Sequence, residues 1–312
     1  MSWAETTVRD LITTLRSGLP HGAAIAVAAV DADSGCSRTD EAPDDARFEI
    51  GSITKTMTGT VLASLVDDGI IELRDEIGRW LDAGPNGDIT IGELATHTSG
   101  LPRLSPSHLP GALDPYAFLT AEVAEQELRR IPARKAAVAD HDYSNFGYQL
   151  LGLVLERAEL RPFPKLLAER VFEPLGMDAT GVPGQSGGVQ LLGHAGGVPV
   201  TRWTHHLWGA GGVESTATDM LRYLTASLRP LDSRVGAAIR AAQQPLAHLD
   251  PMRSVGLGWS IGPPGYLGHD GGTAGFRSML GVRRDAVRAA AVFVNDKAAR
   301  GLGAAVRAAL DT

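Results

Sequence analysis

The N-terminal part of the chain begins with apolar residues at helical spacing and continues with a run of strand length. Apolar side chains recur every three or four positions over residues 5–17, and Gly18 ends this pattern. The unbroken apolar run at 23–30 has the length of a strand and leads into turn residues. We therefore expect a helix and then a strand, with a second strand ending at residues 48–50. The apolar face of the helix consists of Val8, Leu11, Ile12 and Leu15.

A second helix, with very little charge, follows Gly51 and Ser52. Apolar side chains form a stripe along residues 53–66, and small residues cover much of the remaining surface. Because a surface helix normally keeps one charged face, this pattern predicts a helix that is buried on most sides. The stripe consists of Ile53, Met57, Val61, Leu65 and Val66.

The rest of the chain divides into a helical middle and a strand-rich end. Residues 73–177 hold helical segments joined by turns rich in proline and glycine, and residues 181–200 hold seven glycines in 20 positions, which predicts a long surface loop. Strands at both ends with helices between them predict an α/β layer that is built from both termini and interrupted by a helical insertion. The C-terminal part shows a helix at 217–228, short apolar runs at 255–261, 266–269, 276–283 and 289–295, and a last helix at 298–310.

Composition and charge exclude several classes of function. The 312 residues carry 29 basic and 36 acidic side chains, a net charge of −7, without a basic block that would suit nucleic acid or an anionic membrane. The single Cys36 excludes an internal disulfide framework and any multi-cysteine metal or redox site. Glu5 and Asp10 stand where a signal peptide needs positive charge, and the nearest apolar run is far shorter than the ~20 residues of a membrane helix. We therefore expect a cytoplasmic protein without a membrane partner.

Only four of the basic residues are lysines, and one of them lies in a pattern suited to nucleophilic catalysis. Lys55 follows Ser52 by three residues, so the amine and the hydroxyl share one face of the predicted helix. At the helix N-terminus free N–H groups favour developing negative charge, and burial would lower the pKa of Lys55 far enough for it to act as a base. The alternative is an N-cap serine beside a solvated lysine. The other lysines are Lys135, Lys165 and Lys297.

Two further segments bring polar groups together at short spacing. Tyr143 and Asn145 lie two residues apart before an apolar helix, so both can face one cavity; alternatively, Tyr143 is a packing residue. The glycine-rich segment 268–273 contains His269 and Asp270 and exposes N–H groups where a substrate can approach closely. The alternative for this segment is a hairpin turn with an incidental histidine.

In this order, Ser-x-x-Lys, Tyr-x-Asn and His-x-Gly resemble the motifs of the serine penicillin-recognising enzymes. That family includes penicillin-binding proteins, class C β-lactamases and related esterases and amidases. The resemblance covers roughly residues 20 to 300. Supporting stretches are Phe48-Glu49-Ile50-Gly51-Ser52-Ile53-Thr54-Lys55, Leu94-Ala95-Thr96-His97-Thr98-Ser99-Gly100-Leu101-Pro102, Glu173-Pro174-Leu175-Gly176-Met177 and Gly211-Gly212-Val213-Glu214-Ser215-Thr216.

The resemblance implies a β-lactamase/transpeptidase-like α/β fold. An antiparallel sheet from both termini would be flanked by helices, with an inserted, mostly helical subdomain. We expect residues 1–72 and 213–312 to form a discontinuous α/β subdomain, residues 73–212 to form the helical subdomain, and the active site to lie at their interface.

The resemblance also implies an acyl-enzyme mechanism without a metal or cofactor. Ser52 would attack an ester or amide carbonyl, while Lys55 and Tyr143 share the proton transfers; which of them is the base stays open. The backbone N–H groups of Ser52 and Gly272 would form the oxyanion hole, which is typically worth ~3 kcal/mol per donor. Substrate-binding residues would be Asn145, which also holds Lys55, and His269, Asp270 and Gly271.

Two features bear on the substrate. No segment between Tyr143 and His269 supplies the glutamate and asparagine with which class A β-lactamases activate the deacylating water. An ionised Asp270 cannot donate a hydrogen bond and would repel a substrate carboxylate if it points into the cleft, so we predict weak or absent β-lactam turnover. On the alternate face of its strand it would have no such effect.

The leading hypothesis is a serine hydrolase that cleaves an ester or amide of a small molecule. An acyltransferase using the same acyl-enzyme, and a D,D-peptidase or β-lactamase, are alternatives with the same chemistry. A non-catalytic ligand-binding module on this fold is an alternative of a different class. The sequence leaves the oligomeric state open.

Overall fold

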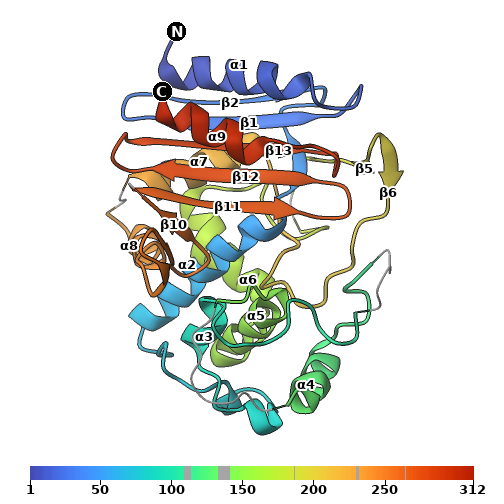
Figure 1. Ribbon diagram of the computed structural model, residues 1–312, viewed down its shortest axis with the longest axis vertical. Coiled ribbons are helices and arrows are strands. Elements are labelled where there is room, and N and C mark those ends of the chain that lie inside the picture. The colour runs from blue at the N-terminus through green and yellow to red at the C-terminus, as the bar shows by residue number, and fades with distance from the viewer. Residues whose placement is uncertain (109–113, 133–140, 186, 230–231, 264) are drawn as a thin grey trace.

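The computed structural model describes residues 1–108, 114–132, 141–185, 187–229, 232–263 and 265–312. Its largest element is an eight-stranded antiparallel sheet with the strand order β2-β1-β13-β12-β11-β10-β9-β8. The N-terminal β1 pairs with the C-terminal β13, with Ile25 opposite Val294, so both ends of the chain build one layer, as the sequence predicts (Figure 1). The strands are β1 (Ile25–Val30), β2 (Gly35–Asp40), β8 (Ala247–Asp250), β9 (Arg253–Val255), β10 (Ser260–Gly262), β11 (Tyr266–Gly272), β12 (Arg277–Arg283) and β13 (Arg288–Val294).

Helices cover both faces of this sheet. The helices α1 (Trp3–Arg16) and α9 (Leu302–Asp311) pack on one face, and α7 (Ala217–Leu228) packs on the other (Figure 1). Successive residues of β1 therefore enter two different hydrophobic clusters, Ile25 and Val27 with α1 and α9, and Ala26 and Ala28 with the main core. This double burial explains why β1 reads as an unbroken apolar run.

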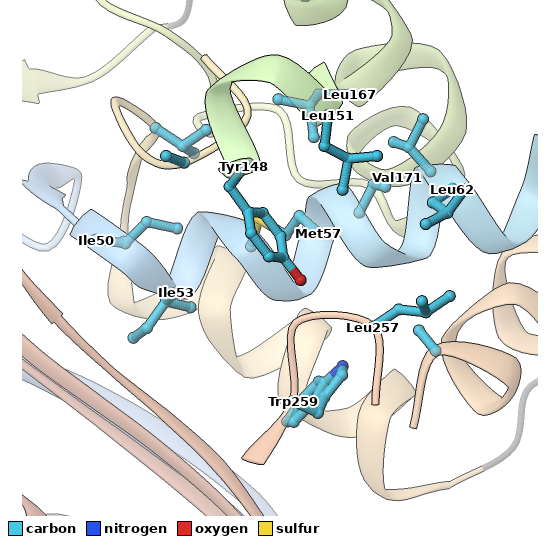
Figure 2. Close-up of a cluster of buried hydrophobic side chains, with 14 of the residues drawn as sticks. Ile50, Ile53, Met57, Leu62, Tyr148, Leu151, Leu167, Val171, Leu257 and Trp259 are labelled. Atoms are coloured by element: carbon cyan, nitrogen blue, oxygen red, sulfur yellow. The ribbon is translucent and has the colours of Figure 1, made fainter. Parts of the chain in front are cut away.

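The helix α2 (Thr54–Asp67) runs through the main core, which confirms the prediction of a buried helix. A short 3₁₀ turn, η1 (Gly51–Ile53), precedes it, and 11 of its 14 residues are buried. Figure 2 shows Tyr148 and Leu151 packed around it from one side and Leu257 and Trp259 from the other. A Cβ atom at Gly59 would lie 2.0 Å from the Leu257 carbonyl oxygen, so the close approach of these segments requires glycine at that position.

The middle of the chain is mainly helical. Apart from an isolated bridge between Glu76 and Thr90, the described residues from 70 to 180 contain no strand pairing. None of the helices in the described part of the chain is both long and apolar enough to cross a membrane. The helical elements are η2 (Ile77–Arg79), η3 (Gly84–Asn86), α3 (Ile91–Ala95), α4 (Ala121–Arg130), α5 (Asn145–Glu159), α6 (Phe163–Leu167), η4 (Ala168–Phe172), η5 (Glu173–Leu175) and, further on, α8 (Arg234–Ala242).

Two predicted segments differ from the structure. The segment 181–200, expected to be a loop, contains β4 (Val189–Gln190), β5 (Gly193–Ala195) and β6 (Val198–Val200). These strands are very short and largely exposed, so they lack the alternation that marks a strand in a sequence. The run 255–261, expected to be one strand, is two strands with a turn between them, because Leu257 and Trp259 turn into the core around α2 (Figure 2).

The second predicted strand is likewise two strands in different sheets. β2 ends at residue 40, and β3 (Ala46–Glu49) pairs with β4 and β7 (Glu214–Ser215) instead. The pairing of β3 with β7 brings the end of the strand before Ser52 next to the segment 210–213. The division into subdomains at residues 72 and 213 stays a prediction.

Candidate active site

The Ser52 hydroxyl and the Lys55 amine meet at the N-terminal end of the buried helix. The Lys55 Nζ lies 3.1 Å from the Ser52 Oγ, as a three-residue spacing on a helix allows. Nζ also donates hydrogen bonds to the Asn145 Oδ1 and to the Ala210 carbonyl oxygen, both at 2.8 Å. Because those two oxygens can only accept, they occupy two N–H groups of the amine. The remaining position of the amine faces the Ser52 hydroxyl.

Lys55 is an unusual lysine because no part of it is exposed to solvent. Its burial, assisted by the positive charge of Arg103, lowers its pKa well below the ordinary lysine value, while the negative charge of Asp270 opposes this shift. An uncharged amine with two N–H groups bonded to carbonyl oxygens directs its lone pair at the third neighbour. The geometry therefore suits proton transfer from Ser52 to Lys55, and it argues against the solvated lysine of the alternative interpretation.

Tyr143 lies over the same amine. The Lys55 Nζ is 5.0 Å from the centroid of the Tyr143 ring, and the phenol is hydrogen-bonded to Ser52. Burial raises the pKa of Tyr143 well above the usual tyrosine value, and the hydrogen bond with Ser52 and the charge of Arg103 oppose this shift. Ser52, Lys55 and Tyr143 are thus brought together, as the sequence predicts, in a geometry that lets a proton pass among them.

Asn145 connects Lys55 to a residue that the sequence analysis missed. The Asn145 amide oxygen accepts a hydrogen bond from the Lys55 amine at 2.8 Å, and the amide nitrogen donates to the Tyr116 hydroxyl at 3.2 Å. Tyr116 is 8% exposed, and burial raises its pKa. Asn145 is therefore fixed from both ends of its side chain.

His97 fixes the start of the helix that carries Asn145. Its Nδ1 accepts a hydrogen bond from the Ser144 N–H at 3.1 Å, and its ring lies 4.5 Å from the Tyr143 ring between centroids. Burial first, and nearby positive charges second, lower the pKa of His97 to about 2, so the ring is neutral and its Nδ1 is free to accept. The backbone of His97 has a φ of 59°, a left-handed conformation in the turn after α3.

The oxyanion hole predicted at Ser52 and Gly272 is consistent with the backbone geometry. The Thr273 N–H donates to the Phe276 carbonyl and closes the hairpin between β11 and β12. The alternation of an antiparallel ladder then directs the Gly272 N–H away from β12, towards the free edge of β11. A Cβ atom at Gly51 would lie 2.6 Å from the Gly272 nitrogen, which shows how closely this N–H approaches the Ser52 turn.

Gly271 has a packing role. A Cβ atom there would lie 2.1 Å from the Ser278 Oγ and 2.2 Å from the Ile50 carbonyl oxygen. Any larger side chain would therefore push β11 away from the Ser52 turn. Gly271 is absent from the cleft lining that the structure describes, and its predicted contact with substrate stays a prediction.

His269 and Asp270 occupy opposite faces of β11. His269 is 9% exposed, its Nδ1 donates to the Asp270 carbonyl oxygen at 2.6 Å, and its ring lies 6.2 Å from the Tyr143 ring. Burial lowers the pKa of His269 to about 4, so a neutral ring lies behind Tyr143. The Asp270 side chain is exposed and lines the same cleft as Ser52, so it lies on the cleft face of the strand and not on the alternate face.

The cleft above Ser52 has a volume of about 920 Å³. One wall is aromatic: the ring of Tyr116 stacks on His205 at 5.2 Å and meets Trp203 edge-on at 5.4 Å. Burial lowers the pKa of His205 to about 4. The charged side chains along the cleft are Arg103, Asp270, Arg277 and Lys297.

Several of these cleft residues were missed in the sequence. Arg103 follows directly on the Gly100-Leu101-Pro102 stretch, and Ala210 precedes the quoted Gly211-Gly212 stretch, so proximity to a family motif is the one signal that could have found them. In the described part of the chain no three His, Cys, Asp or Glu side chains are grouped as a metal site would require.

Comparison with known proteins identifies the family. A family model described as Beta-lactamase matches residues 20–311, almost the whole chain. The chain belongs to the β-lactamase family. It is therefore a serine hydrolase, and the Ser52 hydroxyl and the Lys55 amine of its Ser-x-x-Lys pair lie within hydrogen-bonding distance.

Individual members of the β-lactamase family show how far the similarity extends. The chain is 32% identical over 263 residues to the D-alanyl-D-alanine-carboxypeptidase/endopeptidase AmpH of Escherichia coli (strain K12), a match that covers 76% of this chain and 67% of that one. It is 30% identical over 242 residues to a β-lactamase of Yersinia enterocolitica, covering 72% and 60%. The chain thus spans roughly two thirds of the length of these relatives.

A solved structure confirms the predicted fold class. The structure of a class C β-lactamase mutant superimposes with a TM-score of 0.82 and covers 98% of this chain and 95% of that chain, at 18% sequence identity. The antiparallel sheet from both termini with flanking helices is therefore the β-lactamase/transpeptidase-like fold.

Proposed function

We propose that this member of the β-lactamase family cleaves an ester or amide of a small molecule through an acyl-enzyme on Ser52. The observation that carries the proposal is the coordination of Lys55, whose amine is bound by two carbonyl oxygens and has its remaining position on the Ser52 Oγ at 3.1 Å. The nucleophile and base are within direct hydrogen-bonding reach, as covalent catalysis requires.

The reaction follows from this geometry. The Ser52 Oγ attacks the carbonyl carbon while its proton passes to Lys55 or Tyr143, and the oxyanion accepts hydrogen bonds from the N–H groups of Ser52 and Gly272. The same pair then protonates the departing alcohol or amine. Water attacks the acyl-enzyme in the reverse sense and releases the acid. Lys55 and Tyr143 thus supply general acid and base catalysis in both acylation and deacylation, which typically raises the rate about 10²–10⁴-fold.

The cleft supports a substrate with a flat, apolar acyl group. Tyr116, Trp203 and His205 provide an aromatic wall beside Asn145, and ring pairs of this kind favour stacked or edge-on contacts. Asp270 still argues against a carboxylate close to the reacting carbonyl, although Arg277 and Lys297 line the cleft as well. Weak β-lactam turnover therefore stays a prediction.

Peptidase activity is the second candidate, because AmpH, to which the chain is 32% identical, is named a D-alanyl-D-alanine-carboxypeptidase/endopeptidase. Acyl transfer to an amine or alcohol uses the same acyl-enzyme and differs only in the acceptor. A catalytically inactive ligand-binding role is disfavoured by the assembled Ser52, Lys55 and Tyr143.

The test uses the full chain and its Ser52→Ala variant. Both are incubated with p-nitrophenyl acetate, with a fluorescent penicillin and with a peptide ending in D-alanyl-D-alanine, while turnover and intact mass are followed. We expect ester turnover and a transient acyl adduct in the native protein and neither in Ser52→Ala. Equal turnover by the two proteins would refute the proposal. Cleavage of the peptide alone would establish the second candidate instead, and ester consumption that rises with added amine would indicate transfer.

The proposal includes a cytoplasmic location. Fractionation of the cells that produce this protein, followed by detection with an antibody, tests that part separately.

A further inference from the structure

Arg103 lies beside Tyr143, and no acidic side chain in the described part of the chain pairs with it. Its guanidinium carbon lies 4.9 Å from the centroid of the Tyr143 ring, and its exposed side chain lines the cleft. Among the described residues its side chain forms no ion pair or hydrogen bond. The contact with the Tyr143 ring is an attraction between a cation and the face of an aromatic ring.

The backbone around Arg103 fixes this position. The Arg103 carbonyl oxygen accepts hydrogen bonds from the N–H groups of Asn145 at 2.9 Å and Phe146 at 3.3 Å. The preceding Pro102 carbonyl accepts from the Ser144 hydroxyl at 2.7 Å. The backbone of Arg103 is therefore held against the turn that contains Tyr143, which keeps the guanidinium within reach of the Tyr143 ring.

The other groups around Tyr143 make Arg103 its most durable positive charge. The histidines His97 and His269 are neutral, and Lys55 loses its proton more readily than an ordinary lysine. A guanidinium stays protonated at every pH at which the protein is folded. The titratable, charged and polar groups that act on Tyr143 from the surrounding elements are Ser52 and Lys55, His97 and Arg103, Tyr116, Tyr148, and His269 and Asp270.

We propose that Arg103 is a positioning residue whose fixed positive charge, held against the Tyr143 ring, favours the deprotonated form of the Tyr143–Lys55 pair and so prepares it to accept the Ser52 proton. This inference rests on the proposed function of Ser52. A cation over the face of an aromatic ring is attracted by the ring, and more strongly when the phenol loses its proton. The charge of Arg103 acts in this direction on the pKa of both Tyr143 and Lys55.

The experiment compares the pH dependence of the wild type, Arg103→Gln and Arg103→Lys. The substrate is p-nitrophenyl acetate, which is neutral, so a carboxylate-binding role of Arg103 cannot influence the result. We expect the acidic limb of kcat/KM in Arg103→Gln to move up by about half to one pH unit. At pH values below this limb, kcat/KM of Arg103→Gln should be about three- to tenfold lower than that of the wild type, and above the limb the two values should agree. Arg103→Lys should keep most of the wild-type limb.

A matched control is available on the surface. Arg79 stacks on Trp80 at the same 4.9 Å, and its side chain is 64% exposed. Arg79→Gln should leave the pH profile unchanged. An unchanged limb in Arg103→Gln, or a loss that is equal at every pH and confined to KM, would overturn the inference.

A second measurement separates this inference from the proposed function. A neutral fluorophosphonate forms a bond between phosphorus and the Ser52 Oγ and releases fluoride, while the Ser52 proton passes to the base. The rate of this labelling, followed by intact mass, reports the protonation of the base without any substrate. Two independent outcomes are possible. Full ester turnover by Ser52→Ala would refute the proposed function. A labelling profile of Arg103→Gln that has the same pH dependence as the wild type would show that Arg103 does not act on the Tyr143–Lys55 pair.

Discussion

The Lys55 amine and the Ser52 hydroxyl are joined by a 3.1 Å contact at the N-terminal end of α2, a helix in which 11 of the 14 residues are buried. The two residues depend on each other: the helix fixes their separation, and the burial of the helix removes water from the amine. A residue type that normally carries charge at the surface thereby becomes available as an uncharged base. The polar atoms that compensate its burial come from two distant segments, at Asn145 and Ala210.

Replacement of Lys55 is the first prediction. Lys55→Met keeps the length and burial of the side chain but removes the proton acceptor, so kcat/KM for p-nitrophenyl acetate should fall by about 10²–10⁴-fold. Lys165→Met is the control, because the Lys165 side chain is 63% exposed and forms an ion pair with Glu169 at 3.8 Å, away from Ser52. Circular dichroism and thermal unfolding of both variants establish that they are folded. Retention of more than a tenth of the activity in Lys55→Met would show that Lys55 is not the base.

The motifs and the buried helix could be predicted from the sequence because they depend on short spacings. Ser52 and Lys55 are three residues apart on one helix, and Tyr143 and Asn145 are two apart, so local geometry nearly determines how each pair lies. The pairing of strands from the two ends of the chain followed from the positions of the apolar runs. These features depend on information that is local in the sequence or periodic along it.

The partners that complete the site depend on long-range contacts and could not be predicted in this way. Ala210 contributes a carbonyl oxygen, which every residue has, and Tyr116 reaches Asn145 only because of the path of the chain between α3 and α5. The strands β4, β5 and β6 are too short and too exposed to show periodicity. The turn at 256–259 carries Leu257 and Trp259, whose side chains pack in the core (Figure 2). In the sequence these apolar residues extend the neighbouring apolar run, which therefore resembles one strand.

A second prediction concerns acid stability and His97. Its pKa is about 2 in the folded chain and about 6.5 when unfolded, so below pH 6.5 the unfolded chain binds a proton that the folded chain does not. The free energy of unfolding therefore decreases as the pH falls, by about 2 kcal/mol from this residue between pH 6.5 and pH 5. In His97→Asn, which retains an acceptor and tolerates the left-handed backbone, this part of the decrease should disappear.

Urea unfolding at pH 7 and pH 5 measures this difference directly. His248→Asn serves as the control, since His248 is exposed and its replacement should leave the decrease unchanged. The same decrease in wild type and His97→Asn would mean that His97 takes up a proton in the folded state.

A third prediction tests how closely β11 approaches the Ser52 turn. In Gly271→Ala the new methyl group would lie 2.2 Å from the Ile50 carbonyl oxygen, so the strand must shift. We expect a loss of about 3 kcal/mol in the free energy of unfolding, and a larger loss of acylation because the Gly272 N–H moves with the strand. Gly262→Ala, on β10 of the same sheet, is the control, because the nearest atom to its methyl group would be 3.7 Å away. Wild-type activity in Gly271→Ala would show that the approach is not needed.

The last prediction concerns the second hydrogen bond of Asn145. Tyr116→Phe removes the hydroxyl that accepts from the Asn145 amide nitrogen at 3.2 Å but keeps the ring that stacks on His205. The amide loses one of the two contacts that set its orientation, and Lys55 loses a fixed partner, so kcat should fall by about tenfold, the equivalent of one hydrogen bond. KM should change little, because the aromatic wall is intact. Tyr223→Phe provides the contrast: its hydroxyl bonds to Thr56 in the core, so that variant should unfold more easily while its kcat stays at the wild-type value. A Tyr116→Phe enzyme with normal kcat and a raised KM would instead assign the Tyr116 hydroxyl to substrate binding.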